Sequence, residues 1–156
     1  MKSKLLTGLA LSCAVTGLSA CGSSAPAPAE ATASSALAVA NARLMLAPVK
    51  GNPAAAYFDL TNKGSKEWML TGASLAGSQS STLHTTDEKG GSMEEMPQVP
   101  VKPGETVHFE PGHLHVMVMD PPADLAPGGK SQLTLKFLGG DTMSFPVEAK
   151  PAGAER

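Results

Sequence analysis

The chain has 156 residues, of which 42% are hydrophobic and 17% are charged, and its formal net charge is -2. This length suits one domain, and the mild acidity without a basic run argues against a nucleic-acid partner. Sixteen glycines and thirteen prolines with only 4% aromatic residues favour a turn-rich β protein over a helical one.

The first residues resemble a secretory signal. A short basic start, MKSK, precedes an apolar run that is too short and too rich in small residues for a good membrane span, and the run ends in LSAC at Cys21. This pattern predicts a lipoprotein signal peptide over residues 1–20 and acylation of the Cys21 thiol after cleavage. An ordinary signal peptide followed by a chance cysteine is the alternative.

The stretch that follows has the composition of a tether. Residues 21–36 are rich in Gly, Ser, Ala and Pro and show no apolar period, which indicates a flexible linker. We therefore expect one folded domain over residues 37–150 and a short tail over 151–156. The two cysteines, Cys13 and Cys21, both lie before this domain. Without a thiolate the domain cannot be a thiol oxidoreductase or a blue-copper electron carrier.

The domain reads as a series of short strands. Within 37–46 the apolar residues lie at odd positions at first and at even positions later. This change of strand face predicts a β-bulge or two short strands. Gly139-Gly140 is a hairpin signal, and no segment sustains a helical period. Some seven to nine strands are expected, an all-β pattern typical of a β-sandwich or Greek-key barrel. The strands that can be delimited are 37–46, 54–62, 68–76, 80–87, 105–110, 114–120, 131–138 and 141–149.

One of these strands carries an unusual set of side chains. In HLHVMVMD (113–120), strand alternation puts His115, Met117 and Met119 on one face and Val116 and Val118 on the other. The valine face is the natural core face, so the histidine and methionines point the other way. A central strand buried on both faces, with methionine as packing, is the alternative.

A second cluster strengthens the metal-binding interpretation. LHTTDEKGGSMEEM holds His84, Met93 and Met96 in a polar, acidic context, where methionine is poorly explained as core. Two histidines and two methionines from separate segments would form a closed four-ligand site. Soft, uncharged thioethers with imidazole select Cu(I), whereas Zn(II) would be expected to recruit cysteine or carboxylates.

The residues also resemble a known family, the periplasmic copper chaperones called PCu(A)C. The segments that match in order are AAAYFDLTNKGSKEWMLTGASLAGSQSSTLHTT, SMEEM, VKPGETVHFEPGHLHVMVMD and SQLTLKFLGGDTMSFPV. They cover nearly all of the expected domain, and the His-x-Met pair falls right after a Pro-Gly turn. The resemblance implies a cupredoxin-like Greek-key β-sandwich that binds Cu(I) through two histidines and two methionines, and it implies copper delivery to the CuA centre of cytochrome c oxidase.

The resemblance also implies which residues bind. His84 matches the first histidine of the family, and His115 with Met117 matches the His-x-Met pair. The fourth ligand is ambiguous, because the spacing from His84 favours Met96 and the spacing to His115 favours Met93. Met96 is preferred, since the second methionine of the family's Met-x-Met turn is the ligand.

Three further side chains lie outside this set of four predicted ligands. His113 stands where the family prefers glycine; it is either a surface turn residue or a spare ligand that would help bind Cu(II) or receive copper during transfer. Met119 is an additional candidate ligand. His108 alternates with apolar neighbours and is expected to face solvent.

The sequence thus predicts a copper carrier, not an enzyme, anchored in the cell envelope outside the cytoplasm through lipidated Cys21. Its acceptor would be a cytochrome c oxidase CuA domain or another copper chaperone, reached by ligand exchange, so the site should lie at the surface. Two other functions fit the same residues. One is a copper-sequestering or resistance lipoprotein with the same site, and the other is a structural envelope β-sandwich in which His and Met are incidental.

Overall fold

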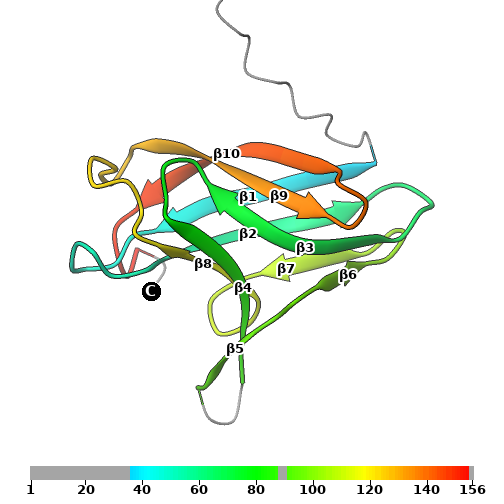
Figure 1. Cartoon of the computed structure of the whole chain (residues 1–156), viewed down its shortest axis with the longest axis horizontal. Coiled ribbons are helices and arrows are strands. Elements are labelled where there is room, and N and C mark those ends of the chain that lie inside the picture. The colour runs from blue at the N-terminus through cyan, green and yellow to red at the C-terminus, as the bar shows by residue number, and fades with distance from the viewer. Residues whose placement is uncertain (1–35, 88–90, 155–156) are drawn as a thin grey trace, which may run out of the picture.

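A computed structural model describes residues 36–87 and 91–154, and within them the chain forms ten strands and no helix (Figure 1). The predicted signal peptide, the acylated Cys21 and nearly all of the tether lie outside the described residues. No helix among the described residues is long and apolar enough to cross a membrane. The strands are β1 (Leu37–Met45), β2 (Ala54–Asn62), β3 (Trp68–Leu75), β4 (Ser80–Thr86), β5 (Met93–Glu95), β6 (Val99–Val101), β7 (Thr106–Phe109), β8 (His115–Met119), β9 (Lys130–Phe137) and β10 (Thr142–Lys150).

Every strand delimited in the sequence is present, with each end within one residue of its predicted position. The count of seven to nine was too low because β5 and β6 have three residues each and are too short to show alternation. In β6, Pro100 lies exposed between buried Val99 and Val101. Proline suits this place because β6 is an edge strand of the sheet.

The predicted irregularity in β1 is a β-bulge. The pairing of β1 with β2 shifts register between Ala40 and Arg43, and Asn41 has a φ of 55°. Asparagine tolerates this left-handed conformation better than most residues. The bulge explains why the apolar residues of β1 change parity along the strand.

The strands form one curled sheet in the order β5-β4-β8-β2-β1-β10-β9-β3-β6, with β7 also paired to β2. The β1–β10 pair is parallel and the others are antiparallel. Two strands pair with β2 along the same edge. β8 pairs with Ala54–Ala56, and β7 pairs with Phe58–Thr61. The hairpin of β4 and β5 projects from the body of the molecule (Figure 1). The fold is all-β, as the sequence predicted.

The core lies between the layers of the curled sheet. Alternate residues of β2 are buried, and the Phe58 ring stacks on Phe109 of β7 with centroids 4.3 Å apart. The same ring meets Phe145 of β10 edge-on at 5.3 Å. Burying a side chain of this size contributes about 1.5–3 kcal/mol. The three rings therefore join β2 and β7 to β10, which is separated from β2 by β1 in the sheet.

Asn62, the last residue of β2, is a fully buried polar side chain, with 0% of its surface exposed. Its amide nitrogen donates to the carbonyls of Lys66 at 2.7 Å and Val101 at 3.0 Å, and its oxygen accepts from the Gly64 N–H at 3.0 Å. Asn62 therefore ties the end of β2 to the following turn and to β6.

We expect Asn62→Ala to lower the free energy of unfolding by about 2–3 kcal/mol, because it removes three hydrogen bonds, of which the one to the Val101 carbonyl is buried. Urea unfolding measures this loss. The control is Asn52→Ala in an exposed loop, which should stay within about 0.5 kcal/mol of the unmodified chain. Equal effects of the two substitutions would show that water replaces the Asn62 bonds.

Asp59 of β2 connects three strands through its carboxylate. The Asn41 amide in the β1 bulge donates to Oδ2 at 2.6 Å, and Nδ1 of His108 on β7 donates to Oδ1 at 2.7 Å. The hydrogen bond from Asn41 and then the one from His108 lower the pKa of Asp59 below its usual value of 3.8. His108 is exposed, as the sequence predicted.

The lowered pKa of Asp59 predicts an acid-sensitive contribution to stability. The unfolded chain takes up the proton at a higher pH than the folded chain does, so the contribution is complete above pH 3.8 and is lost as pH falls through the folded pKa. Melting temperatures of the chain and of Asp59→Asn, from about pH 5 to about pH 2.5, should converge towards acid pH. Parallel curves would contradict this assignment. Other carboxylates titrate in both proteins and cancel in the comparison.

Candidate metal site

The pairing of β4 with β8 brings the two predicted histidine ligands together. His84 lies directly opposite His115, and Thr82 lies opposite Met117. Residues directly opposite each other in an antiparallel pair share one face of the sheet. The two imidazole rings lie 5.9 Å apart between centroids, with their planes 27° apart. Three of the four predicted ligands are thus neighbours on one face.

This face is the one that β8 turns away from the core. Val116 and Val118 are fully buried in the core, as predicted, while Met117 is half-buried on the other side. The residues of the predicted site differ in their exposure. His115 is 6% exposed whereas Met119 is 37% exposed, so the site runs from an enclosed histidine to an open methionine end.

Neighbouring β2 residues account for the burial of His115. The Tyr57 ring lies 6.3 Å from the His115 ring between centroids, tilted by 50°, and Ala55 lies opposite Met117. Tyr57 therefore covers one side of the histidine, while the small side chain of Ala55 leaves room beside the methionine.

A backbone hydrogen bond orients the His115 ring. Nδ1 lies 3.0 Å from the carbonyl oxygen of His113. A carbonyl only accepts, so Nδ1 carries the proton and donates. In a neutral ring, Nε2 then keeps its lone pair for a metal ion.

The His84 ring has one bonded and one unbonded nitrogen. Nε2 lies 2.8 Å from the Thr82 hydroxyl. Nδ1 is buried and has no hydrogen-bond partner within the described part of the chain. A buried polar atom left without a partner is uncommon and costly, which makes this nitrogen a candidate for binding a metal ion.

The two candidate methionines occupy different parts of the projecting hairpin. The Met96 N–H donates to the Leu83 carbonyl at 2.8 Å, next to His84, and its half-buried side chain packs against the core cluster. Met93 lies opposite Thr86, nearer the tip, and is 56% exposed. β5 ends at Glu95 and Pro97 follows, so strand alternation does not fix the direction of the Met96 side chain. The fourth ligand therefore stays a prediction, with Met96 preferred.

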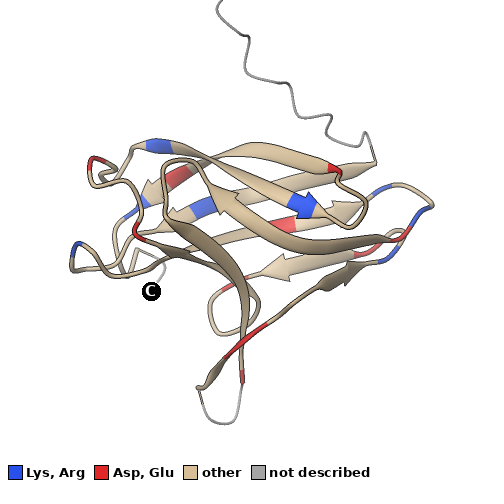
Figure 2. Ribbon diagram, in the orientation of Figure 1, with Lys and Arg blue, Asp and Glu red and all other residues tan. Residues whose placement is uncertain are grey.

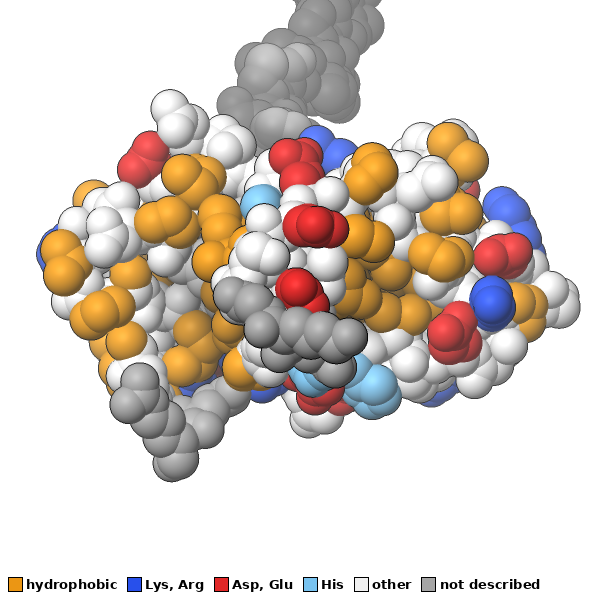
Figure 3. Space-filling view, turned by 90° about the horizontal axis from the view of Figure 1, so that it is seen from below, with side chains coloured by type: hydrophobic (Ala, Val, Ile, Leu, Met, Phe, Trp, Pro, Cys, Tyr) orange, Lys and Arg blue, Asp and Glu red, His pale blue; other side chains and the backbone are white. Residues whose placement is uncertain are grey.

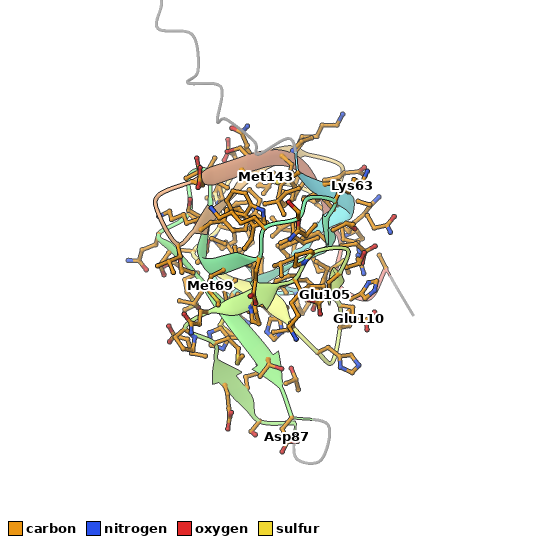
Figure 4. All side chains as sticks on the ribbon, turned by 90° about the vertical axis from the view of Figure 1, so that its right-hand side faces the viewer. Lys63, Met69, Asp87, Glu105, Glu110 and Met143 are labelled. Atoms are coloured by element: carbon orange, nitrogen blue, oxygen red, sulfur yellow. The ribbon has the colours of Figure 1, made fainter. Side chains whose placement is uncertain are left out.

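The hairpin beside the site is acidic. Glu95 lies opposite His84, and Glu94 lies opposite Thr85. Figure 2 shows acidic positions and no basic ones on the described part of this hairpin, and Figure 4 places Asp87 at its far end. From below, acidic and histidine side chains lie between hydrophobic areas (Figure 3). Sequence reasoning missed Glu95, because its register depends on the short strand β5.

Thr82 is a second residue that sequence reasoning missed. It shares its strand face with His84, two residues away, so strand parity could have found it. No group of three or more His, Cys, Asp or Glu among residues 36–87 and 91–154 could hold a metal ion. His113 is an exposed turn residue whose Nε2 lies 4.0 Å from Oε1 of Glu110. Its role as a ligand, like that of Met119, stays a prediction.

Comparison with known proteins identifies the family. The model of a family described as "LpqE-like: Putative lipoprotein LpqE-like" matches residues 37–149. The chain belongs to the LpqE-like family. A curated relative from Leifsonia xyli subsp. xyli, named "Putative lipoprotein Lxx21020", is 29% identical over 150 residues, covering 94% of this chain and 90% of its own.

Solved structures similar to this LpqE-like chain include copper-bound proteins. The solution structure of CuI-DR1885 from Deinococcus radiodurans is 28% identical with a TM-score of 0.57, covering 82% of this chain and 87% of its own. The copper-bound PCuAC domain from PmoF2 is 20% identical with a TM-score of 0.62, covering 74% of this chain and 93% of its own. The second likeness supports the fold alone. The predicted family resemblance and the cupredoxin-like fold are thereby confirmed.

The face assignment gives a direct test of the predicted ligands. His115→Ala and Met117→Ala should each weaken Cu(I) binding at least about tenfold, because each removes a ligand. Val147→Ala is the control, because Val147 is a buried core residue of β10, outside the two strands that carry the predicted histidines; it should lower stability by about 1–3 kcal/mol and leave Cu(I) affinity unchanged. Thermal melts and Cu(I) titrations of the three variants measure both quantities. Unfolding of the ligand variants with full affinity in the remaining folded protein would show that these side chains only pack.

The hairpin methionines are tested against each other. We expect Met96→Ala to reduce Cu(I) affinity more than Met93→Ala, because Met96 is anchored beside His84 whereas Met93 lies two residues further out. Competition titration with a chromophoric chelator measures both affinities. A larger loss for Met93→Ala would assign the fourth ligand to the hairpin tip.

Proposed function

We propose that this chain is a copper carrier of the cell envelope that binds one Cu(I) through His84, His115, Met117 and Met96. The observation that carries the proposal is the cross-strand pair of histidine rings with Met117 on the same face. The hydrogen bond at Nδ1 leaves Nε2 of His115 with a lone pair, and Nδ1 of His84 is buried without a hydrogen-bond partner among residues 36–87 and 91–154. The similarity to the structure titled CuI-DR1885 supports the choice of metal.

The ligand chemistry favours Cu(I) over other metal ions. Thioether sulfur is soft and uncharged, imidazole is borderline, and this set suits monovalent copper better than Zn(II) or Mg(II). Four neutral ligands leave the positive charge of the ion uncompensated. Glu95, opposite His84, and the other acidic residues of the hairpin place negative potential beside that charge.

The arrangement also suits release of the ion. His115 is enclosed by β2, whereas Met96 directly follows the three-residue strand β5 at the edge of the sheet. An incoming ligand from an acceptor would bind Cu(I) while this thioether dissociates, so the metal changes partners without becoming free. The imidazole of His115 would be the last ligand to leave.

The lipoprotein features support a carrier anchored to a membrane. The curated relative carries lipoprotein in its name, and LSAC at Cys21 supplies an acylation site in this chain. Residues 21–36 would then let the domain reach an acceptor in the periplasm or outside the cell. The acceptor is a cytochrome c oxidase CuA domain or another copper chaperone, and the chain itself catalyses no reaction.

One titration followed by one mixing experiment tests this function. The chain should take up one equivalent of Cu(I) in competition with a chromophoric chelator, and the His84→Ala/His115→Ala double variant should not. The loaded chain is then mixed with an apo CuA domain, and the copper content of both proteins is measured after separation. Transfer supports the carrier. Tight binding without transfer to this or another copper acceptor would indicate a sequestering protein, and no binding would leave a structural β-sandwich.

A further inference from the structure

We propose that Thr82 is a positioning residue that fixes the tautomer of His84, so that His84 presents Nδ1 to Cu(I) while His115 presents Nε2. The inference rests on the proposed copper function and concerns how that site is arranged. Thr82 lies on the same strand face as His84 and directly opposite Met117. Its side chain is therefore adjacent to two of the proposed ligands.

The hydrogen bonds of His84 distinguish its two neutral tautomers. Nε2 lies 2.8 Å from the Thr82 hydroxyl, and Nδ1 is buried without a hydrogen-bond partner in the described residues. If the hydroxyl donated to Nε2, the ring proton would sit on Nδ1 as a buried donor with no acceptor. If Nε2–H donates to the hydroxyl oxygen, Nδ1 keeps a lone pair instead. Only the second tautomer prepares the buried nitrogen for a metal ion.

His115 carries its ring proton on the other nitrogen. Its Nδ1 donates to the His113 carbonyl at 3.0 Å, which leaves Nε2 with the lone pair. The rings nevertheless lie nearly parallel, 5.9 Å apart between centroids. Two different hydrogen-bond partners, a backbone carbonyl and a threonine hydroxyl, would thus make two neighbouring histidines use different nitrogens.

A matched pair of substitutions isolates the hydroxyl. Thr82→Val keeps the size and β-branching of threonine and removes the hydrogen bond, whereas Thr82→Ser keeps the hydroxyl. We expect Thr82→Ser to bind Cu(I) as the unmodified chain does. Thr82→Val should bind about 10–100-fold more weakly, the usual cost of losing a group that orients a metal-binding histidine. Equal affinity of the valine variant and the unmodified chain would overturn the inference.

Nitrogen NMR of the full chain with labelled histidine supplies a readout that does not depend on the variants. Before copper is added, neutral His84 should be protonated at Nε2 and neutral His115 at Nδ1. With Cu(I) bound, the shifted, metal-bound nitrogens should be Nδ1 of His84 and Nε2 of His115. Coordination of His84 through Nε2 would contradict the role of Thr82 while leaving the copper function intact. Absence of Cu(I) binding by the unmodified chain would contradict the copper function itself.

Discussion

The register between β4 and β8 is the constraint on which the site depends. Leu83 lies opposite Val116 on the core face, and both are buried. A slip of one residue would turn the side chains of β4 to the opposite faces, exposing Leu83 and carrying His84 into the core. The hydrophobic core therefore fixes the separation of the two histidine rings. The geometry of the proposed metal site is therefore set by apolar packing on the reverse side of the same strands.

The turn between β7 and β8 contributes the second constraint. Gly112 has a φ of 85°, a left-handed conformation that glycine adopts without steric cost. The Glu110 N–H bonds to the Leu114 carbonyl at 2.8 Å, which closes this turn. The closed turn places the His113 carbonyl next to the His115 ring. A backbone feature thus decides which imidazole nitrogen of His115 is free.

Much of this architecture could be predicted from the sequence, because it follows from alternation within single strands. The strand ends, the bulge in β1 and the shared face of His115 and Met117 are of this kind. Relations between strands were not predictable in the same way. The register of β5 beside His84, the bond from Thr82 and the cover by Tyr57 depend on which strands become neighbours. The fourth ligand stays open for the same reason, since Met96 follows a strand of three residues.

The proposed ligands differ in how firmly the fold holds them. The histidines belong to paired strands with buried neighbours, whereas the hairpin methionine sits at the edge of the sheet. This difference would let the protein bind Cu(I) firmly through the histidines and still release it to a partner when the methionine dissociates. The most direct test of the ligand set is X-ray absorption at the copper edge of the chain loaded with one Cu(I). Nitrogen and sulfur neighbours in about equal number are expected, and a shell of nitrogen or oxygen without sulfur would contradict the account.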